Sequence, residues 1–202
     1  ITHLQEKETE RAQCGAANVR LLRPPLPLPY GTNHGKVWVL MCPQYVRVCV
    51  SSANLIEGDY DRKTQSLWTQ DFPLLTASSS SSSSSKSSSS STSSSSSFSV
   101  GDDFRQTLID YLTRMGIQCA EDLNKYNYTH AAVILITSVP GYHKGPSLSK
   151  YGHMKLRRFV QKEPLPVSFA HSSPVICQIS SLGSLSEAWL DKEFAASVVS
   201  DS

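Results

Sequence analysis

Two short apolar runs separated by a turn constrain the fold of this 202-residue chain more than any other feature. The runs cover residues 37–41 and 45–50, they are rich in Val, and Pro43 and Gln44 lie between them. Runs of β-branched residues with this length and spacing favour two strands joined as an antiparallel hairpin. A hairpin returns the chain to the level at which it began, so the residues after the second strand should lie beside those before the first.

Three polar residues flank this predicted hairpin. His34 and Lys36 precede the first strand, and Asn54 follows the second. Side chains two positions apart in an extended chain point to one face, so the imidazole and the ammonium should share a face, with Asn54 nearby. An imidazole can attack phosphorus, while an ammonium and an amide can bind the oxygens that gain charge in the transition state. The trio therefore suits attack on a phosphodiester without a metal, although a bare His–X–Lys pair more often marks a solvated surface.

The wider segment carries a longer pattern. The string YGTNHGK is followed by an apolar strand and then by SSANLIEGDYDRKTQSLW. This order resembles the first catalytic half of the tyrosyl-DNA phosphodiesterases, a branch of the phospholipase D superfamily. The residues that match are His34, Lys36, Asn54, Asp59, Lys63, Gln65 and Trp68. The chain departs from the family pattern at Asn33, where a second His is usual, and at Gly35, where Thr or Ser is common, and neither change removes a catalytic group.

The resemblance implies a fold and an activity. The fold is α/β, a mixed sheet flanked by helices that forms one half of a phospholipase-D-like two-domain sandwich. The activity is DNA repair in the nucleus by hydrolysis of 3′-phosphotyrosyl and other 3′-end adducts left by trapped topoisomerase, through a phosphohistidine on His34. Lys36 and Asn54 would hold the phosphoryl oxygens, and Gln65 and Asp59 would support the site. No metal or other cofactor is implied.

The same resemblance names the partner. It is DNA, as single-stranded 3′ ends and duplex ends with a covalently attached topoisomerase peptide, and the protein is expected to be a monomer. Tyr30 matches an aromatic position that stacks on a base in the family, and stacking tolerates any base. The net charge of +2 allows a nucleic-acid partner without requiring one. No apolar run is long enough to span a membrane, and the five cysteines show no metal-binding spacing.

A serine tract divides the chain. Residues 78–97 are serine apart from Lys86 and Thr92, and such a tract cannot bury apolar surface to offset its ordering entropy. We therefore expect residues 1–76 to form the first part of one half-domain, 77–100 to form a disordered insert, and 101–202 to form the remainder.

The segment after the tract predicts a helix and a buried strand. Asp102 or Asp103 should cap a helix that Gly116 ends. Its apolar stripe consists of Phe104, Leu108, Ile109, Tyr111, Leu112 and Met115. Residues 131–137, AAVILIT, form a continuous apolar run of strand length and predict a central parallel strand.

Two further features could bind phosphates. A helix from Tyr151 should turn Met154, Leu156, Phe159 and Val160 inward and line another face with Lys155, Arg158 and Lys162, either as an electrostatic track or as a solvated face. The run VICQISSLGS then leads to Ser186, the predicted N-cap of a helix over 187–196. Hydroxyls and free N–H groups at such a turn can hold an anion. The family resemblance assigns Ser180, Ser181 and Ser184 to DNA phosphates.

A second His–X–Lys pair, His153 and Lys155, does not fit the catalytic pattern. It lies at the start of the predicted amphipathic helix, and no Asn follows it in the chain. We therefore expect the second catalytic motif beyond residue 202, so that this chain holds half of a site. The alternative function is a non-catalytic DNA-binding fragment. A lipid-cleaving phospholipase is disfavoured, because the motif lacks the family's Asp near Pro43 and no membrane-binding stretch is visible.

Overall fold

The chain forms two compact units in the computed structural model. One comprises residues 1–26 and 36–133, and the other comprises residues 27–35 and 134–202. The structure describes residues 22, 24, 26, 27, 33–76, 98–118, 120–162, 174–179 and 183–199. The whole serine tract, together with Tyr30, Ser180 and Ser181, therefore lies outside the described residues.

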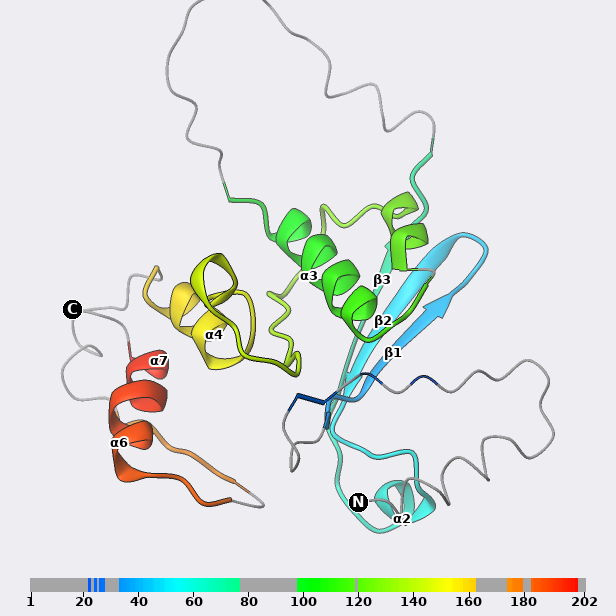
Figure 1. The fold of residues 1–202 in the computed structure, drawn as a ribbon. Helices are drawn as coiled ribbons and strands as arrows, with labels where there is room; N and C mark the ends of the chain where they lie inside the picture. The colour runs from blue at the N-terminus through cyan, green and yellow to red at the C-terminus, as the bar shows by residue number, and fades with distance from the viewer. Residues whose placement is uncertain are drawn as a thin grey trace, which may run out of the picture. The chain divides into compact units, whose positions relative to one another are not determined.

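The first unit is built on a three-stranded antiparallel sheet (Figure 1). Strands β1 (Val37–Met41) and β2 (Tyr45–Ser51) form the predicted hairpin, which pairs Val37 with Val50. The turn is closed by a 2.9 Å hydrogen bond from Cys42 N to Tyr45 O. Strand β3 (Leu67–Pro73) extends the sheet beyond β2 and was missed, because Gln70, Asp71 and Pro73 weaken its apolar pattern.

Helix α3 (Val100–Arg114) packs against one face of this sheet (Figure 1). The Phe104 ring lies 4.9 Å from that of Phe72 on β3, and Phe72 lies 4.6 Å from Tyr128. Val46 and Val48 of β2 are fully buried. Gly101 is required by this packing, because a Cβ there would lie 2.2 Å from the backbone oxygen of Tyr128. The predicted helix and its apolar stripe are confirmed.

The helix start differs from the prediction. Ser99, not Asp102 or Asp103, is the N-cap, and its hydroxyl accepts a 3.3 Å hydrogen bond from Asp102 N. Both aspartates lie in the first turn, where a carboxylate interacts favourably with the helix dipole but does not cap the helix. Ser99 and Val100, which we assigned to the insert, belong to this helix start. Gly116 ends the helix in the left-handed region, with φ of 82°, as predicted.

The predicted parallel strand over 131–137 is wrong. The segment forms no strand, and the described sheet has only antiparallel pairs rather than the mixed pairing we expected. Instead, the Gln70 side chain on β3 satisfies the nearby backbone: Nε2 donates to His130 O at 2.6 Å, and Oε1 accepts from Ala132 N at 3.0 Å. An apolar run becomes a strand only where a neighbouring strand offers its backbone, and the described residues offer none here.

Short helical elements complete the first unit. Helix α2 (Glu57–Asp61) links β2 to β3, and the 3₁₀ helix η2 (Ala120–Lys125) follows α3. An isolated bridge joins Leu74 to Tyr126. None of the helices in the described part of the chain has the length and apolar character needed to cross a bilayer.

The second unit is helical. It contains η3 (Gly145–Ser147), α4 (Gly152–Val160), α6 (Glu187–Trp189), η4 (Leu190–Ala195), which winds as a π-helix, and α7 (Ala196–Val198). The two predicted helices are confirmed. Ser186 caps the second as expected, and its hydroxyl accepts a 3.1 Å hydrogen bond from Trp189 N.

Candidate active site

The hairpin brings two candidate residues to one end of the sheet. Ser51 N donates a 3.0 Å hydrogen bond to Lys36 O, so the residue before β1 pairs with the last residue of β2. Asn54 follows three positions later. Lys36 and Asn54 are both half-buried. The hairpin thus holds an ammonium and an amide at the same end of the first unit.

His34 lies two residues before Lys36 and is exposed. It belongs to the segment 27–35, which clusters with the second unit, whereas Lys36 and Asn54 belong to the first. Only Gly35 separates His34 from Lys36 in the sequence. Its placement beside Asn54 stays a prediction.

Asp59 organises the surroundings of Asn54. Its Oδ2 atom accepts hydrogen bonds from Asn54 N at 2.8 Å and from Asn54 Nδ2 at 2.7 Å, and its Oδ1 atom accepts from Lys63 Nζ at 2.6 Å. Helix α2 supplies Asp59, and Lys63 follows one turn later on the loop that leads to β3. The segment between β2 and β3 is thereby closed around one carboxylate.

The carboxylate of Asp59 is ionised over the ordinary pH range. The hydrogen bond from Lys63, followed by those from the Asn54 backbone and amide, lowers its pKa from 3.8 to about 2. The side chain of Asp59 is almost completely buried, and that of Lys63 is 63% exposed. A buried negative charge is therefore matched by a cation that reaches it from solvent.

Gln65 uses both ends of its amide within the protein. Its Nε2 atom donates to Asp59 O at 3.0 Å, and its Oε1 atom accepts a 2.6 Å hydrogen bond from Ser52 Oγ. Ser52 in turn accepts from Ser66 N at 2.9 Å. Gln65 is thus a brace between α2 and the ends of β2 and β3. Ser52 was missed by sequence reasoning, although a Ser pair directly after an apolar strand marks a site for such end bonds.

The predicted phosphate-binding residues are only partly described. Ser184 is exposed and lies in a segment without regular structure, and Gly183 has open space around it. Tyr30, Ser180 and Ser181 lie outside the described residues. The anion site at this turn therefore stays a prediction.

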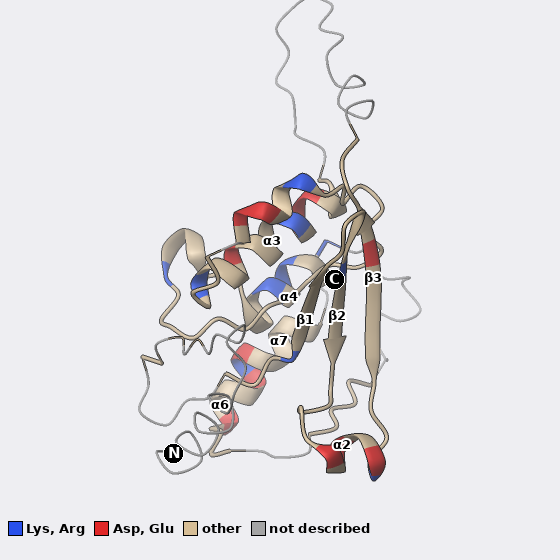
Figure 2. Ribbon diagram, turned by 90° about the vertical axis from the view of Figure 1, so that its right-hand side faces the viewer, with Lys and Arg blue, Asp and Glu red and all other residues tan. Residues whose placement is uncertain are grey.

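Helix α4 carries several basic residues, which are blue in Figure 2, but one of its lysines is buried. Arg157 and Arg158 are half-buried, with the Arg158 guanidinium 4.8 Å from the Phe159 ring centre. Lys155 is only 2% exposed, and its Nζ lies 5.7 Å from the same ring. The prediction that Lys155 lines an exposed basic face is wrong, because neighbouring elements cover the helix where its periodicity suggested solvent.

The second His–X–Lys pair lies on helix α4, as predicted. His153 Nδ1 lies 2.9 Å from Ser197 Oγ, and Ser197 Oγ donates to Glu193 O at 2.7 Å. Because that hydroxyl has one hydrogen, His153 must donate from Nδ1 to Ser197. The His153 ring also meets the Trp189 ring edge-on, with centres 5.7 Å apart. This histidine therefore joins two helical segments.

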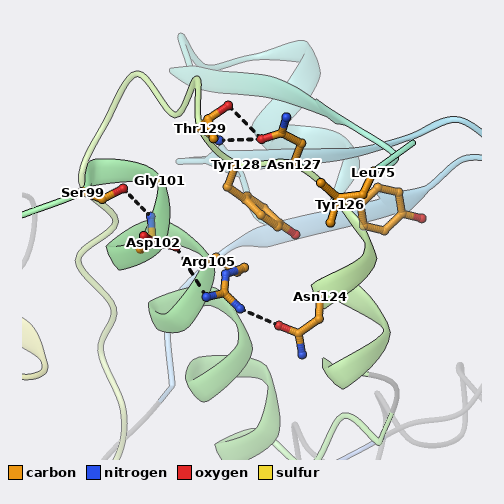
Figure 3. A pocket seen from close by; sticks show the side chains of 10 residues that line it. All are labelled: Leu75, Ser99, Gly101, Asp102, Arg105, Asn124, Tyr126, Asn127, Tyr128 and Thr129. Carbon is orange, nitrogen blue, oxygen red and sulfur yellow. Dashed lines mark hydrogen bonds and ion pairs between the residues drawn. The ribbon is translucent and has the colours of Figure 1, made fainter. Parts of the chain in front are cut away.

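A polar cavity of about 270 Å³ opens at the start of α3 (Figure 3). Its polar groups bind one another: Arg105 donates to Asn124 Oδ1 at 2.8 Å and pairs with Asp102 at 3.5 Å, and Thr129 donates to Asn127 from its N–H and its hydroxyl. The residues that line the cavity thus connect α3 to the segment 124–129. Within the described ranges, no three His, Cys, Asp or Glu side chains gather closely enough to hold a metal.

Comparisons with known proteins agree with the sequence pattern. A family model described as tyrosyl-DNA phosphodiesterase matches residues 1–202. The chain is 40% identical over 198 residues to tyrosyl-DNA phosphodiesterase 1 of Arabidopsis thaliana, a match that covers 91% of this chain and 30% of the relative. It is 29% identical over 195 residues to the Drosophila melanogaster protein of that name, covering 91% and 31% of the two chains. A probable tyrosyl-DNA phosphodiesterase of Caenorhabditis elegans is 30% identical over 183 residues, covering 86% and 36%. The chain spans about a third of the length of these relatives.

Proposed function

The chain belongs to the tyrosyl-DNA phosphodiesterase family, and we propose that it supplies the first half of the active site of a phosphodiesterase that repairs DNA 3′ ends in the nucleus. The observation that supports this role is the paired end of the β1–β2 hairpin. There Lys36 meets the last residue of β2, and the Asn54 amide is held by Asp59. A cation and an oriented amide next to a histidine are the groups that attack on a phosphodiester needs.

The reaction begins at His34. Its imidazole attacks the 3′ phosphorus, a nitrogen–phosphorus bond forms, and the bond from phosphorus to the tyrosine oxygen breaks. Lys36 and Asn54 hold the non-bridging oxygens, where negative charge develops. The departing phenolate takes a proton from a general acid, and the same group later removes a proton from the water that cleaves the phosphohistidine. We assign that acid to a second histidine beyond these 202 residues, because His153 is engaged with Ser197 on α4.

The substrate is DNA whose 3′ end carries a topoisomerase peptide or another adduct. Arg157 and Arg158 on α4, with Ser180, Ser181 and Ser184, would contact phosphates, and Tyr30 would stack on a base. These contacts are mainly to the backbone, so binding should depend little on sequence. We propose that the protein acts as a monomer.

A second candidate function is DNA binding without turnover. It is favoured by the placement of the two His–X–Lys pairs, because the described residues put only one of them ahead of a strand. A chain with half of a site could bind DNA, or stall as a covalent adduct, without completing the reaction.

The test is covalent trapping. The full-length protein is incubated with a 3′-phosphotyrosyl oligonucleotide, and the protein–DNA adduct is resolved on a denaturing gel. His34→Ala should abolish the adduct, because no nitrogen nucleophile remains at that position. His130→Ala is the matched control, since His130 is exposed and only its backbone oxygen is bonded. Undiminished adduct in His34→Ala would refute the assignment.

A further inference from the structure

The Asp59 carboxylate is buried, and both of its oxygens are hydrogen-bonded. It is 2% exposed and accepts three hydrogen bonds, two of them from Asn54 and one from Lys63. A buried carboxylate is costly unless its oxygens are paired, so this arrangement is strongly specified once the segment folds. Its main contacts go to a residue of the proposed site.

The bonding pattern determines which way the Asn54 amide points. An ionised carboxylate only accepts hydrogen bonds, so the amide atom that faces Asp59 Oδ2 at 2.7 Å must be the nitrogen. A flipped amide would bring two oxygens together. One hydrogen of Nδ2 is therefore committed to Asp59, and the second remains available to an oxygen of a bound phosphate.

We propose that Asp59 is a positioning residue that acts through Asn54, orienting its amide so that an N–H meets a phosphoryl oxygen. The inference rests on the proposed function and deepens it. Asp59 itself does not touch substrate, because its oxygens are occupied by Asn54 and Lys63. The backbone N–H of Asn54 donates to the same oxygen as its side chain, so main chain and amide are held as one piece.

Lys63 has a separate role, which is to balance the charge of Asp59. An unmatched carboxylate beside Asn54 would repel an anionic phosphate, and the Lys63 ammonium at 2.6 Å neutralises it. Lys63 is the charged group that the described residues place against Asp59; Glu57 and Asp61, the other acids of α2, are exposed. Gln65 completes the frame by donating to Asp59 O at 3.0 Å. Amide orientation and charge balance thus come from different neighbours.

A merely structural role would look different in kinetics. If Asp59 only closed the loop between β2 and β3, its loss would slow adduct formation whether or not residue 54 carried an amide. If it acts through the amide, its loss should matter only while the amide is present. A double-mutant cycle on Asp59 and Asn54 therefore separates the two roles.

The experiment measures the single-turnover rate of covalent adduct formation by the full-length protein with a 3′-phosphotyrosyl oligonucleotide. Asn54→Ala should slow the step roughly 10²–10³-fold, the usual loss for one oxyanion donor. Asp59→Asn, which allows the amide to flip, should slow it about 10–100-fold, as loss of an orienting partner does elsewhere. The double variant should be no slower than Asn54→Ala. Asp71→Asn is the matched control, because Asp71 also carries an ion pair, with Arg47 at 2.6 Å, but on the sheet and without contact to Asn54.

A second variant guards against loss of fold. Lys63→Met changes an exposed side chain and removes the largest cause of the low pKa of Asp59. The unmatched carboxylate should then repel the phosphate and slow adduct formation, and the ratio of the unaltered to the variant rate should shrink as salt screens the repulsion, whereas a purely structural role would give a ratio that salt leaves unchanged. Multiplicative losses in the cycle, or a ratio that does not change with salt, would overturn this inference while the adduct itself still supported the proposed function. No adduct from the unaltered protein would overturn both.

Discussion

The chain contains the same three-residue pattern twice, in two different kinds of secondary structure. His34 and Lys36 lead directly into strand β1, and His153 and Lys155 lie in helix α4. Residues two apart share a face in an extended chain but lie about 200° apart around a helix. A histidine–lysine pair can therefore act on one substrate in the first setting and cannot in the second.

The environments of the two pairs bear this out. His34 is exposed and Lys36 is half-buried. His153, by contrast, hydrogen-bonds the fully buried Ser197, and Lys155 lies against Phe159 inside the second unit. The helical pair thus holds the fold together through two separate sets of contacts, whereas the other pair lies directly before strand β1, at the paired end of the hairpin. A short motif has chemical meaning only together with the element that carries it.

The largest contrast should appear when each lysine is replaced by methionine, which keeps the length of the side chain and removes the charge. Lys36→Met should slow adduct formation roughly 10²–10³-fold, because a cation that stabilises the transition-state oxygens is lost. Lys155→Met should leave the rate unchanged, since Lys155 is buried on helix α4 of the second unit, whereas Lys36 lies at the hairpin of the first. Single-turnover kinetics on both variants measures this, and equal losses would break the comparison.

Truncation to alanine should reverse the order for stability. Lys155→Ala removes a side chain that is 2% exposed and should cost roughly 2–5 kcal/mol of the free energy of unfolding, as for other buried long side chains. Lys36→Ala should cost less than this, because the Lys36 side chain is only half-buried. Urea unfolding followed by circular dichroism gives both values. A stable Lys155→Ala variant would show that this lysine is not a core residue.

The two histidines should also differ in their effect on stability, but by less than the two lysines. His153→Ala loses the hydrogen bond to Ser197 and the edge contact with Trp189, which together should lower stability by about 1 kcal/mol. The adduct rate should not change. Ser197→Ala provides the control: if the two residues act as a pair, the double variant should be little less stable than His153→Ala. Loss of adduct in His153→Ala would mean that the second His–X–Lys pair is catalytic after all.

The smallest effect should be a dependence of stability on acid that belongs to the strand-borne site. The pKa of Asp59 is lowered from 3.8 to about 2 in the folded protein. A depressed pKa means that the folded state favours the ionised form, so its contribution is complete above about pH 4 and is lost as pH falls towards 2. The urea midpoint of Asp59→Asn should accordingly approach that of the unaltered protein at low pH. A constant gap between the two midpoints from pH 7 to pH 2.5 would contradict this.

Much of the fold could be predicted because its signals are local. Alternating and β-branched residues with a Pro43–Gln44 turn specify the β1–β2 hairpin, a 3.6-residue stripe specifies α3, and a Ser186 cap specifies the helix that starts at Glu187. In the site, the return of the chain through the hairpin predicted that Lys36 and Asn54 lie at the same end of it, and the bond from Ser51 N to Lys36 O agrees.

Other features depend on partners that a local pattern does not contain. Residues 131–137 have the composition of a buried strand but form none, since pairing needs a neighbouring backbone and Gln70 satisfies residues 130 and 132 instead. The helical periodicity placed Lys155 on a solvated face, yet the tertiary packing of the second unit buries its side chain.

The sequence by itself thus determined which residues lie in the hairpin and the helices, because propensity, caps and turns act over a few neighbouring positions. Only the tertiary structure decided that Asp59, Lys63, Ser52 and Gln65 form one frame around Asn54. These bonds require α2 and the ends of two strands to meet within hydrogen-bond distance, and such directional contacts are set by packing rather than by the order of residues along the chain.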